Sequence, residues 1–155
     1  MSPALGYGRG GFSSKIHLVT DGQGLPLASI ITGGERHESA FFAEVMNAVR
    51  VPQPTGRPKT RPEAVAGDKG YDAAWIRQWC LQHNIESVIP ARKATRTGPG
   101  RPPTCDDEKY KRRNVVERCI GRLKECRRIA TRYEKKASHY KAMLQWAFVA
   151  EYLNR

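Results

Sequence analysis

Four side chains in a basic stretch near the C-terminus have the types and the spacing for chemistry on a phosphate. Within residues 109–136, offsets of 0, 3, 7 and 14 separate Tyr110, Arg113, Glu117 and Lys124. At about 100° per residue, a helix would place all four within roughly 60° of one another. One face would then carry a phenol, a guanidinium, a carboxylate and an ammonium. This arrangement fits a carboxylate metal ligand in a phosphate-handling site, and it equally fits a solvated basic helix with one ion pair.

The adjoining face of the same stretch is apolar. Val116, Ile120 and Leu123 are spaced to pack against a core. Asp106 or Asp107 is placed to cap the N-terminus of the helix. The pattern therefore predicts one long helix that presents its polar face at a site.

A second acidic side chain, Asp68, lies in the segment GDKGYD directly after the short apolar run of residues 63–66. If that run is a strand, Asp68 stands at its C-terminal end, where open α/β sheets place their ligands. Glycines on both sides leave room around the carboxylate. An aspartate in a turn at a strand end is the alternative. Asp72 is predicted to cap a helix that runs to about His83.

These segments resemble a known family. The spacing Y-x2-R-x3-E-x6-K, followed by RRIATRYEK, resembles the third acidic motif of bacterial insertion-sequence transposases of the DDE type. GGFSSKIHLVTDGQGLPL, GERHES and GDKGYDAAWIRQWC also resemble segments of those proteins, in the same order. The resemblance runs from about residue 10 to residue 155, which is nearly the whole chain.

The resemblance implies a chemistry and a set of site residues. Asp68 and Glu117 would be catalytic residues that hold Mg²⁺ (or Mn²⁺) for cutting and joining DNA by phosphoryl transfer. A group of basic and aromatic side chains would contact the DNA; it comprises Tyr110, Arg113, Lys124, Arg127, Arg128 and Arg132. Asp21 is a weaker candidate for a further acid, because it lies in a predicted hairpin turn.

The order of predicted elements is β-β-α-β-α-β-α-α. Strands are expected at residues 14–20, 25–31, 63–66 and 85–89, and helices at 37–49, 72–83, 109–136 and 138–153. Residues 1–13 are interpreted as a flexible lead-in, and residues 92–104 as a basic loop rich in proline and glycine. This order resembles an α/β ribonuclease-H-like fold, a mixed sheet flanked by helices, that lacks its first, central strand. Residues 14–155 would then form a partial catalytic domain without the first catalytic aspartate.

Composition agrees with a polyanionic partner. The 155-residue chain has a formal net charge of +12. Twelve lysines and arginines against three glutamates lie in residues 109–136, and such concentrated charge is typical of nucleic-acid binding. A mean hydropathy of −0.62 and the absence of a long apolar run argue against a membrane span. A cytoplasmic, nucleoid-associated protein is expected.

Two functions remain open from the sequence. The chain resembles the C-terminal part of a transposase catalytic domain, interpreted as the downstream half of a frame-split or truncated gene. Its partners would be DNA (element ends and target), an upstream fragment that supplies the first strand and its aspartate, and a second copy of the chain. The alternative is a non-catalytic fragment that binds DNA or inhibits the transposase.

Overall fold

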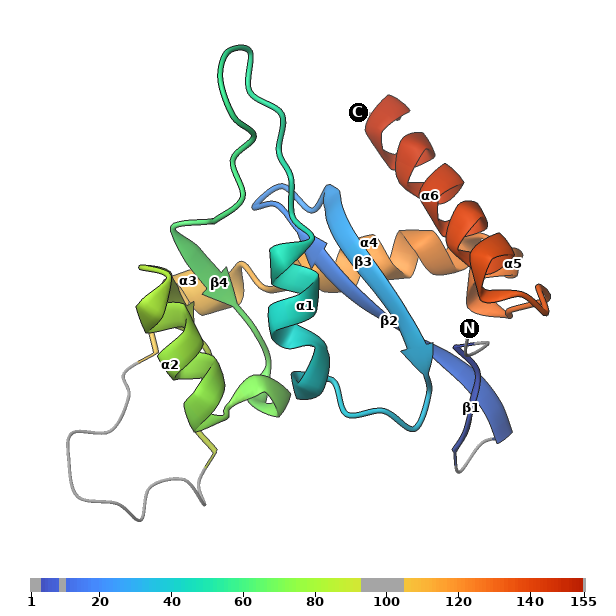
Figure 1. Ribbon diagram of the computed structural model, residues 1–155, viewed down its shortest axis with the longest axis horizontal. Helices are drawn as coiled ribbons and strands as arrows, with labels where there is room; N and C mark the ends of the chain where they lie inside the picture. Colours follow the sequence, from blue (N-terminus) through green and yellow to red (C-terminus); the bar gives the residue numbers. More distant parts are fainter. Residues whose placement is uncertain (1–3, 9–10, 93–104, 155) are drawn as a thin grey trace. The chain divides into compact units, whose positions relative to one another are not determined.

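The computed structural model describes residues 4–8, 11–92 and 105–154, and it has a mixed α/β architecture (Figure 1). The chain divides into two compact units. Unit 1 contains residues 1–37 and 115–155, and unit 2 contains residues 38–114. Each unit holds one small sheet with helices, so the α/β class is confirmed.

The sheet of unit 1 is antiparallel, in the order β1-β2-β3. Its strands are β1 (Gly6–Gly8), β2 (Gly11–Thr20) and β3 (Pro26–Gly33). The predicted hairpin is confirmed, with Ser14 opposite Gly33 and Val19 opposite Ala28. β2 begins three residues earlier than predicted because residues 11–13 pair with β1.

The turn of this hairpin accounts for Asp21. Its Oδ1 accepts hydrogen bonds from the backbone N–H groups of Gln23 and Leu25, each at 2.8 Å. Gly24 follows with φ of +84°, a left-handed conformation that glycine adopts without steric cost. Asp21 therefore has a structural role in closing the turn.

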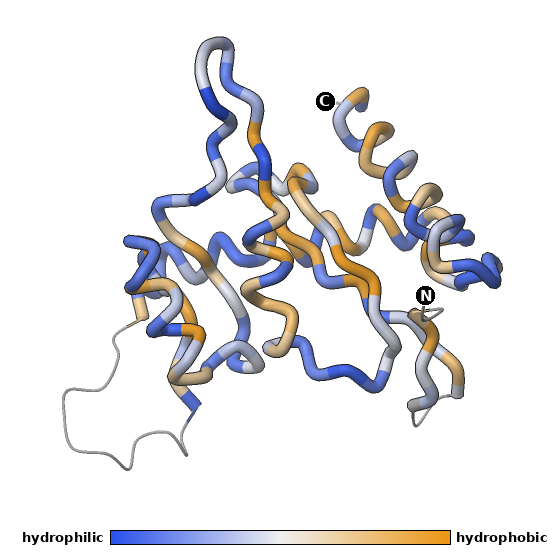
Figure 2. Tube along the Cα trace, viewed as in Figure 1, coloured by the Kyte–Doolittle hydropathy of each residue, from blue (hydrophilic) through white to orange (hydrophobic). Residues whose placement is uncertain are grey.

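Three helices complete unit 1: α4 (Asn114–Glu125), α5 (Arg127–Ala130) and α6 (Ala137–Leu153). They bury an apolar cluster of Cys119, Leu123, Ile129 and Leu144. Ile16, Leu18 and Ile31 of the β2–β3 hairpin pack against that cluster. Figure 2 shows hydrophobic residues concentrated along this hairpin.

The prediction of one continuous helix over residues 109–136 is wrong. α3 (Asp107–Lys111) ends before Arg112, α4 begins at Asn114, and Cys126 separates α4 from α5 with an extended ψ of 107°. Packing explains the second break. In a continuous helix Ile129 would point about 120° away from Leu123, and the break at Cys126 lets both side chains enter one core. Asp106 caps α3, as predicted, by accepting hydrogen bonds from two backbone N–H groups.

Unit 2 contains a parallel strand pair, β4 (Ala64–Ala66) and β5 (Glu86–Val88), joined through the helix α2 (Ala74–Gln82). Both strands and the helix were predicted. The helix expected over residues 37–49 is shorter, a 3-10 turn η1 (Ser39–Phe41) followed by α1 (Phe42–Asn47).

The core of unit 2 is built around Phe42. Its ring meets the Trp79 ring edge to face, with 5.5 Å between centroids. Ile76 and Cys80 of α2 are fully buried, whereas Trp75 of the same helix is 44% exposed. Trp75 stands in the first turn of α2, and its ring centroid is 6.3 Å from that of Phe42.

Most of the predicted loop at residues 92–104 and part of the predicted lead-in lie outside the described residues. Within the described ranges, no helix is long and apolar enough to cross a membrane.

Candidate nucleic-acid and metal site

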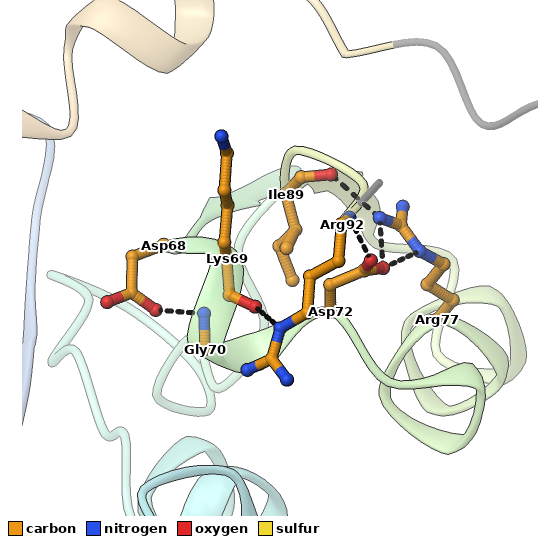
Figure 3. A network of polar contacts seen from close by, with 7 residues as sticks. All are labelled: Asp68, Lys69, Gly70, Asp72, Arg77, Ile89 and Arg92. Atoms are coloured by element: carbon orange, nitrogen blue, oxygen red, sulfur yellow. Dashed lines mark hydrogen bonds and ion pairs between the residues drawn. The ribbon is translucent and has the colours of Figure 1, made fainter. Parts of the chain in front are cut away.

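Asp68 directly follows Gly67 at the C-terminal end of β4 and begins the 3-10 turn η2 (Lys69–Tyr71). Its Oδ1 accepts a hydrogen bond from the backbone N–H of Gly70 at 2.7 Å (Figure 3). A Cβ atom at position 70 would lie 2.8 Å from that oxygen, which is closer than side chains normally approach. The glycine of this motif therefore allows the carboxylate to fold back onto its own backbone.

The phenol of Tyr71 stands beside this carboxylate. Burial, followed by the negative charges of Glu38 and Asp68, raises the pKa of Tyr71 to about 12. The Tyr71 ring packs against Phe42 with 5.9 Å between centroids. Tyr71 therefore remains a neutral phenol near neutral pH and ties η2 to the apolar core.

A second carboxylate, Asp72, connects the segments that follow β4 and β5. Its Oδ1 accepts hydrogen bonds from Arg77 Nε at 3.0 Å and Nη2 at 2.7 Å, and its Oδ2 accepts one from the backbone N–H of Arg92 at 2.6 Å. The expected capping role of Asp72 is wrong, because Ala73 is the N-cap of α2 and makes no side-chain cap bond. Sequence reasoning missed this network because nothing in the sequence joins residue 92 to residue 72.

Glu117 and Lys124 lie on α4, both exposed and seven residues apart, as the spacing predicted. Cys119 and Leu123 anchor the opposite side of this helix in the core of unit 1. The prediction that all four signature residues share one helix is wrong, because Tyr110 and Arg113 lie before α4.

Tyr110 and Arg113 form a local pair of their own. Tyr110 is half-buried in α3, and the guanidinium of Arg113 lies over its ring, 5.5 Å from the centroid. This geometry is a cation–π contact. The structure therefore brings Tyr110 and Arg113 together in unit 2, and it places Glu117 and Lys124 together on α4 in unit 1.

The three arginines of the basic segment differ in their surroundings. Arg127 is exposed, and Nε of Arg128 lies 3.1 Å from Oε1 of Glu134. Arg132 is half-buried, and its guanidinium carbon lies 5.3 Å from the centroid of the Tyr140 ring. The guanidinium donates hydrogen bonds to the hydroxyl of Ser14 and to three backbone carbonyls, those of Ala4, Glu134 and Lys135. Arg132 thus serves the fold of unit 1, and its proposed contact with DNA stays a prediction.

Comparison with known proteins decides the family. Residues 4–150 match the family model described as "Transposase DDE domain". The chain belongs to this family. It is 35% identical over 133 residues to a protein of Burkholderia cepacia named as transposase for insertion sequence element IS402, covering 85% of this chain and 59% of that protein.

A second relative, from Brucella ovis, is named as transposase for insertion sequence element IS6501. It is 28% identical over 137 residues, which cover 87% of this chain and 94% of the relative. The transposase domain described here thus spans 59% of the length of the first relative and nearly the full length of the second. No solved structure matches the chain.

Transposase DDE domains generally depend on divalent metal ions. Asp68 and Glu117 offer hard carboxylate oxygens, the donors that Mg²⁺ and Mn²⁺ prefer. Among the residues that the structure describes, no group of three or more His, Cys, Asp or Glu side chains is arranged to hold a metal ion. The donor type of the two carboxylates therefore fits the ion.

Proposed function

We propose that this chain acts on DNA as part of an insertion-sequence transposase that cuts element ends and joins them to a target. The observation that carries this proposal is the family match over residues 4–150, within which both acidic motifs lie. The net charge of +12 supports a polyanionic substrate. Such a protein would act in the cytoplasm, at the nucleoid.

The proposed fold is ribonuclease-H-like and lacks its first, central strand, with residues 14–155 as a partial catalytic domain. Two observations support it. The antiparallel hairpin β2–β3 and the parallel pair β4–β5 belong to separate sheets. β4 ends one residue before Gly67-Asp68, so its acid stands at a carboxyl end, as the fold requires.

In this proposal Asp68 and Glu117 are the catalytic residues and would hold Mg²⁺ or Mn²⁺. The metal ions would activate the attacking oxygen and stabilise the leaving oxygen. Lys124 and Arg113 would neutralise phosphate charge, and Tyr110 would orient a phosphate or stack on a base. Arg127, Arg128 and Arg132 would contact the DNA backbone.

The resemblance to the family also leads to a proposed partner. An upstream fragment of the transposase would add the first strand and its aspartate to an open sheet edge, and a second copy of the chain would complete the assembly on DNA.

The test is Mg²⁺-dependent nicking of DNA that carries the ends of the insertion sequence encoding the chain. The purified chain is assayed alone and with the upstream fragment, and Asp68→Asn and Glu117→Gln are compared with the unchanged chain. Activity that requires the fragment and both acids supports the proposal. Robust activity from the chain alone would refute the partner, and Asp21→Asn would be the next variant.

A non-catalytic role is the second candidate, favoured by the exposed basic residues of α5. In that case the chain would bind DNA or inhibit the intact transposase. No nicking under any condition, together with salt-dependent binding to DNA, would support this role and contradict the catalytic one.

A further inference from the structure

We infer that Asp72, Arg77 and Arg92 form a brace that fixes the direction of the Asp68 carboxylate. They act on Asp68 through the backbone of the turn, so they are positioning residues. As a claim about a metal ligand, the inference rests on the proposed function. The brace itself is a property of unit 2, and it is tested separately below.

The centre of the brace is a partly buried charge pair. The side chain of Asp72 is 3% exposed and that of Arg77 is 22% exposed, with 2.7 Å between Oδ1 and Nη2. Nη2 of Arg77 also donates a hydrogen bond to the carbonyl oxygen of Ile89 at 2.8 Å. One guanidinium therefore holds the turn after β4 and the chain after β5 at the same time, a task suited to the rigid fork of arginine.

Arg92 closes the loop between these two segments. Its backbone N–H donates to Oδ2 of Asp72 at 2.6 Å, and its Nε donates to the carbonyl oxygen of Lys69 at 2.7 Å. The same carbonyl of Lys69 accepts a hydrogen bond from the backbone N–H of Asp72 at 3.3 Å. The Lys69–Gly70 peptide group is thus held by two donors, and Figure 3 shows the bond from Arg92.

The fixed peptide determines where the carboxylate of Asp68 points. With Lys69 held, the N–H of Gly70 is presented to Oδ1 of Asp68 at 2.7 Å, and the N–H of Tyr71 donates to the backbone carbonyl of Asp68 at 3.0 Å. In Figure 3 the carboxylate of Asp68 lies on the far side of η2 from Asp72. A ligand on a short turn loses conformational freedom in this way before any ion arrives.

Amide hydrogen exchange of the ¹⁵N-labelled full chain tests the brace without any assay of activity. The reporter is the N–H of Gly70, which is bonded to Asp68. The reference is the N–H of Ile85, which donates to the carbonyl of Cys80 at 2.9 Å in the same unit. Arg77→Lys keeps the charge but removes the fork, and the milder Arg92→Ala removes only the side-chain bond to Lys69.

We expect both variants to accelerate exchange at Gly70 by about tenfold or more relative to Ile85. Lys111→Met removes the exposed Lys111–Glu108 ion pair of the same unit and should leave the ratio unchanged. The inference is overturned if Gly70 and Ile85 accelerate together in Arg92→Ala, which would indicate a general structural role. It is also overturned if neither amide responds in either variant.

A titration with Mn²⁺, followed by line broadening at Gly70, links the brace to the metal. The wild-type chain should show broadening, and Arg92→Ala should require about tenfold more ion for the same effect. Equal midpoints in the two proteins would refute the positioning of a metal ligand. If exchange at Gly70 depends on the brace but Mn²⁺ causes no broadening in the wild type, the brace stands and the metal role of Asp68 in the proposed function fails.

Discussion

Asp68 and Glu117 are both candidate metal ligands, yet the chain holds them by opposite means. Asp68 lies in a turn of unit 2 whose backbone is fixed by polar groups, among them the pair Asp72–Arg77. Glu117 lies on a helix of unit 1 whose other face is fixed by apolar packing of Cys119 and Leu123.

The difference follows from the secondary structure. A helix satisfies its own backbone hydrogen bonds, so burying a few apolar side chains is enough to orient the exposed face. A short turn has no such repeat, and its carbonyl and N–H groups need partners from elsewhere in the fold. Mutations should therefore disturb the two acids through different interactions, in the following order of expected size.

The largest effect should come from the apolar support of α4. Leu123→Ala removes a side chain that is 4% exposed, and it should lower the free energy of unfolding of unit 1 by about 2–5 kcal/mol. Urea titration followed by circular dichroism measures the change. Glu125→Gln, an exposed substitution on the same helix, should change the free energy by less than about 0.5 kcal/mol. Equal losses in the two variants would show that packing does not hold α4.

The next effect concerns the turn of Asp68 at high pH. The pKa of Tyr71 is raised from 10.0 to about 12 by burial and two nearby carboxylates. The Tyr71 phenol loses its proton at a lower pH in the unfolded chain than in the folded chain. The contribution of Tyr71 to the free energy of unfolding is therefore complete below pH 10, and it is lost as the pH rises toward 12. The loss should reach about 2–3 kcal/mol.

The comparison of wild type with Tyr71→Phe isolates this contribution. Urea unfolding at several pH values should show a steeper alkaline decline in the wild type than in the variant. Parallel declines would place the cause in other tyrosines, such as Tyr140, whose pKa is also raised by burial.

A smaller effect tests whether polar bracing is confined to unit 2. Arg132 donates hydrogen bonds to Ser14 and to the carbonyl of Ala4, so Arg132→Ala should cost about 1–3 kcal/mol of stability. Arg127→Ala, at an exposed position nearby, should cost less than about 0.5 kcal/mol. Thermal unfolding of both variants measures the contrast, and equal melting temperatures would contradict it.

The last comparison concerns the double variant Arg127→Ala, Arg128→Ala. The effect of this double variant should appear in DNA binding. The logarithm of the affinity falls linearly with the logarithm of the salt concentration, and the slope of this plot should flatten by about 1 for each phosphate that an arginine no longer neutralises. Fluorescence anisotropy on duplex DNA at several salt concentrations measures the slope. An unchanged slope would exclude these arginines from the interface. Adding Arg132→Ala should flatten the slope further only if Arg132 also reaches the DNA.

The local elements and the family were accessible from the sequence. Alternating apolar residues predicted the hairpin β2–β3, the apolar runs predicted β4 and β5, and the 3.6-residue period predicted α2 and α6. The signature around Glu117 pointed to the transposase family that the match over residues 4–150 shows. These features depend on neighbours within a few residues, which is why a linear pattern reveals them.

The tertiary structure decided the rest. The basic stretch has helical periodicity throughout, but Leu123 and Ile129 can share a core only if the helix breaks at Cys126. Asp72 has the residue type and the position expected of a helix cap, but two arginines bind its carboxylate, one of them twenty residues away. In the sequence Arg132 is one more basic side chain, yet it donates a hydrogen bond to the carbonyl of Ala4, 128 residues away. The pairs Arg92–Asp72 and Arg132–Ala4 are distant along the chain, and only folding brings them within hydrogen-bonding distance.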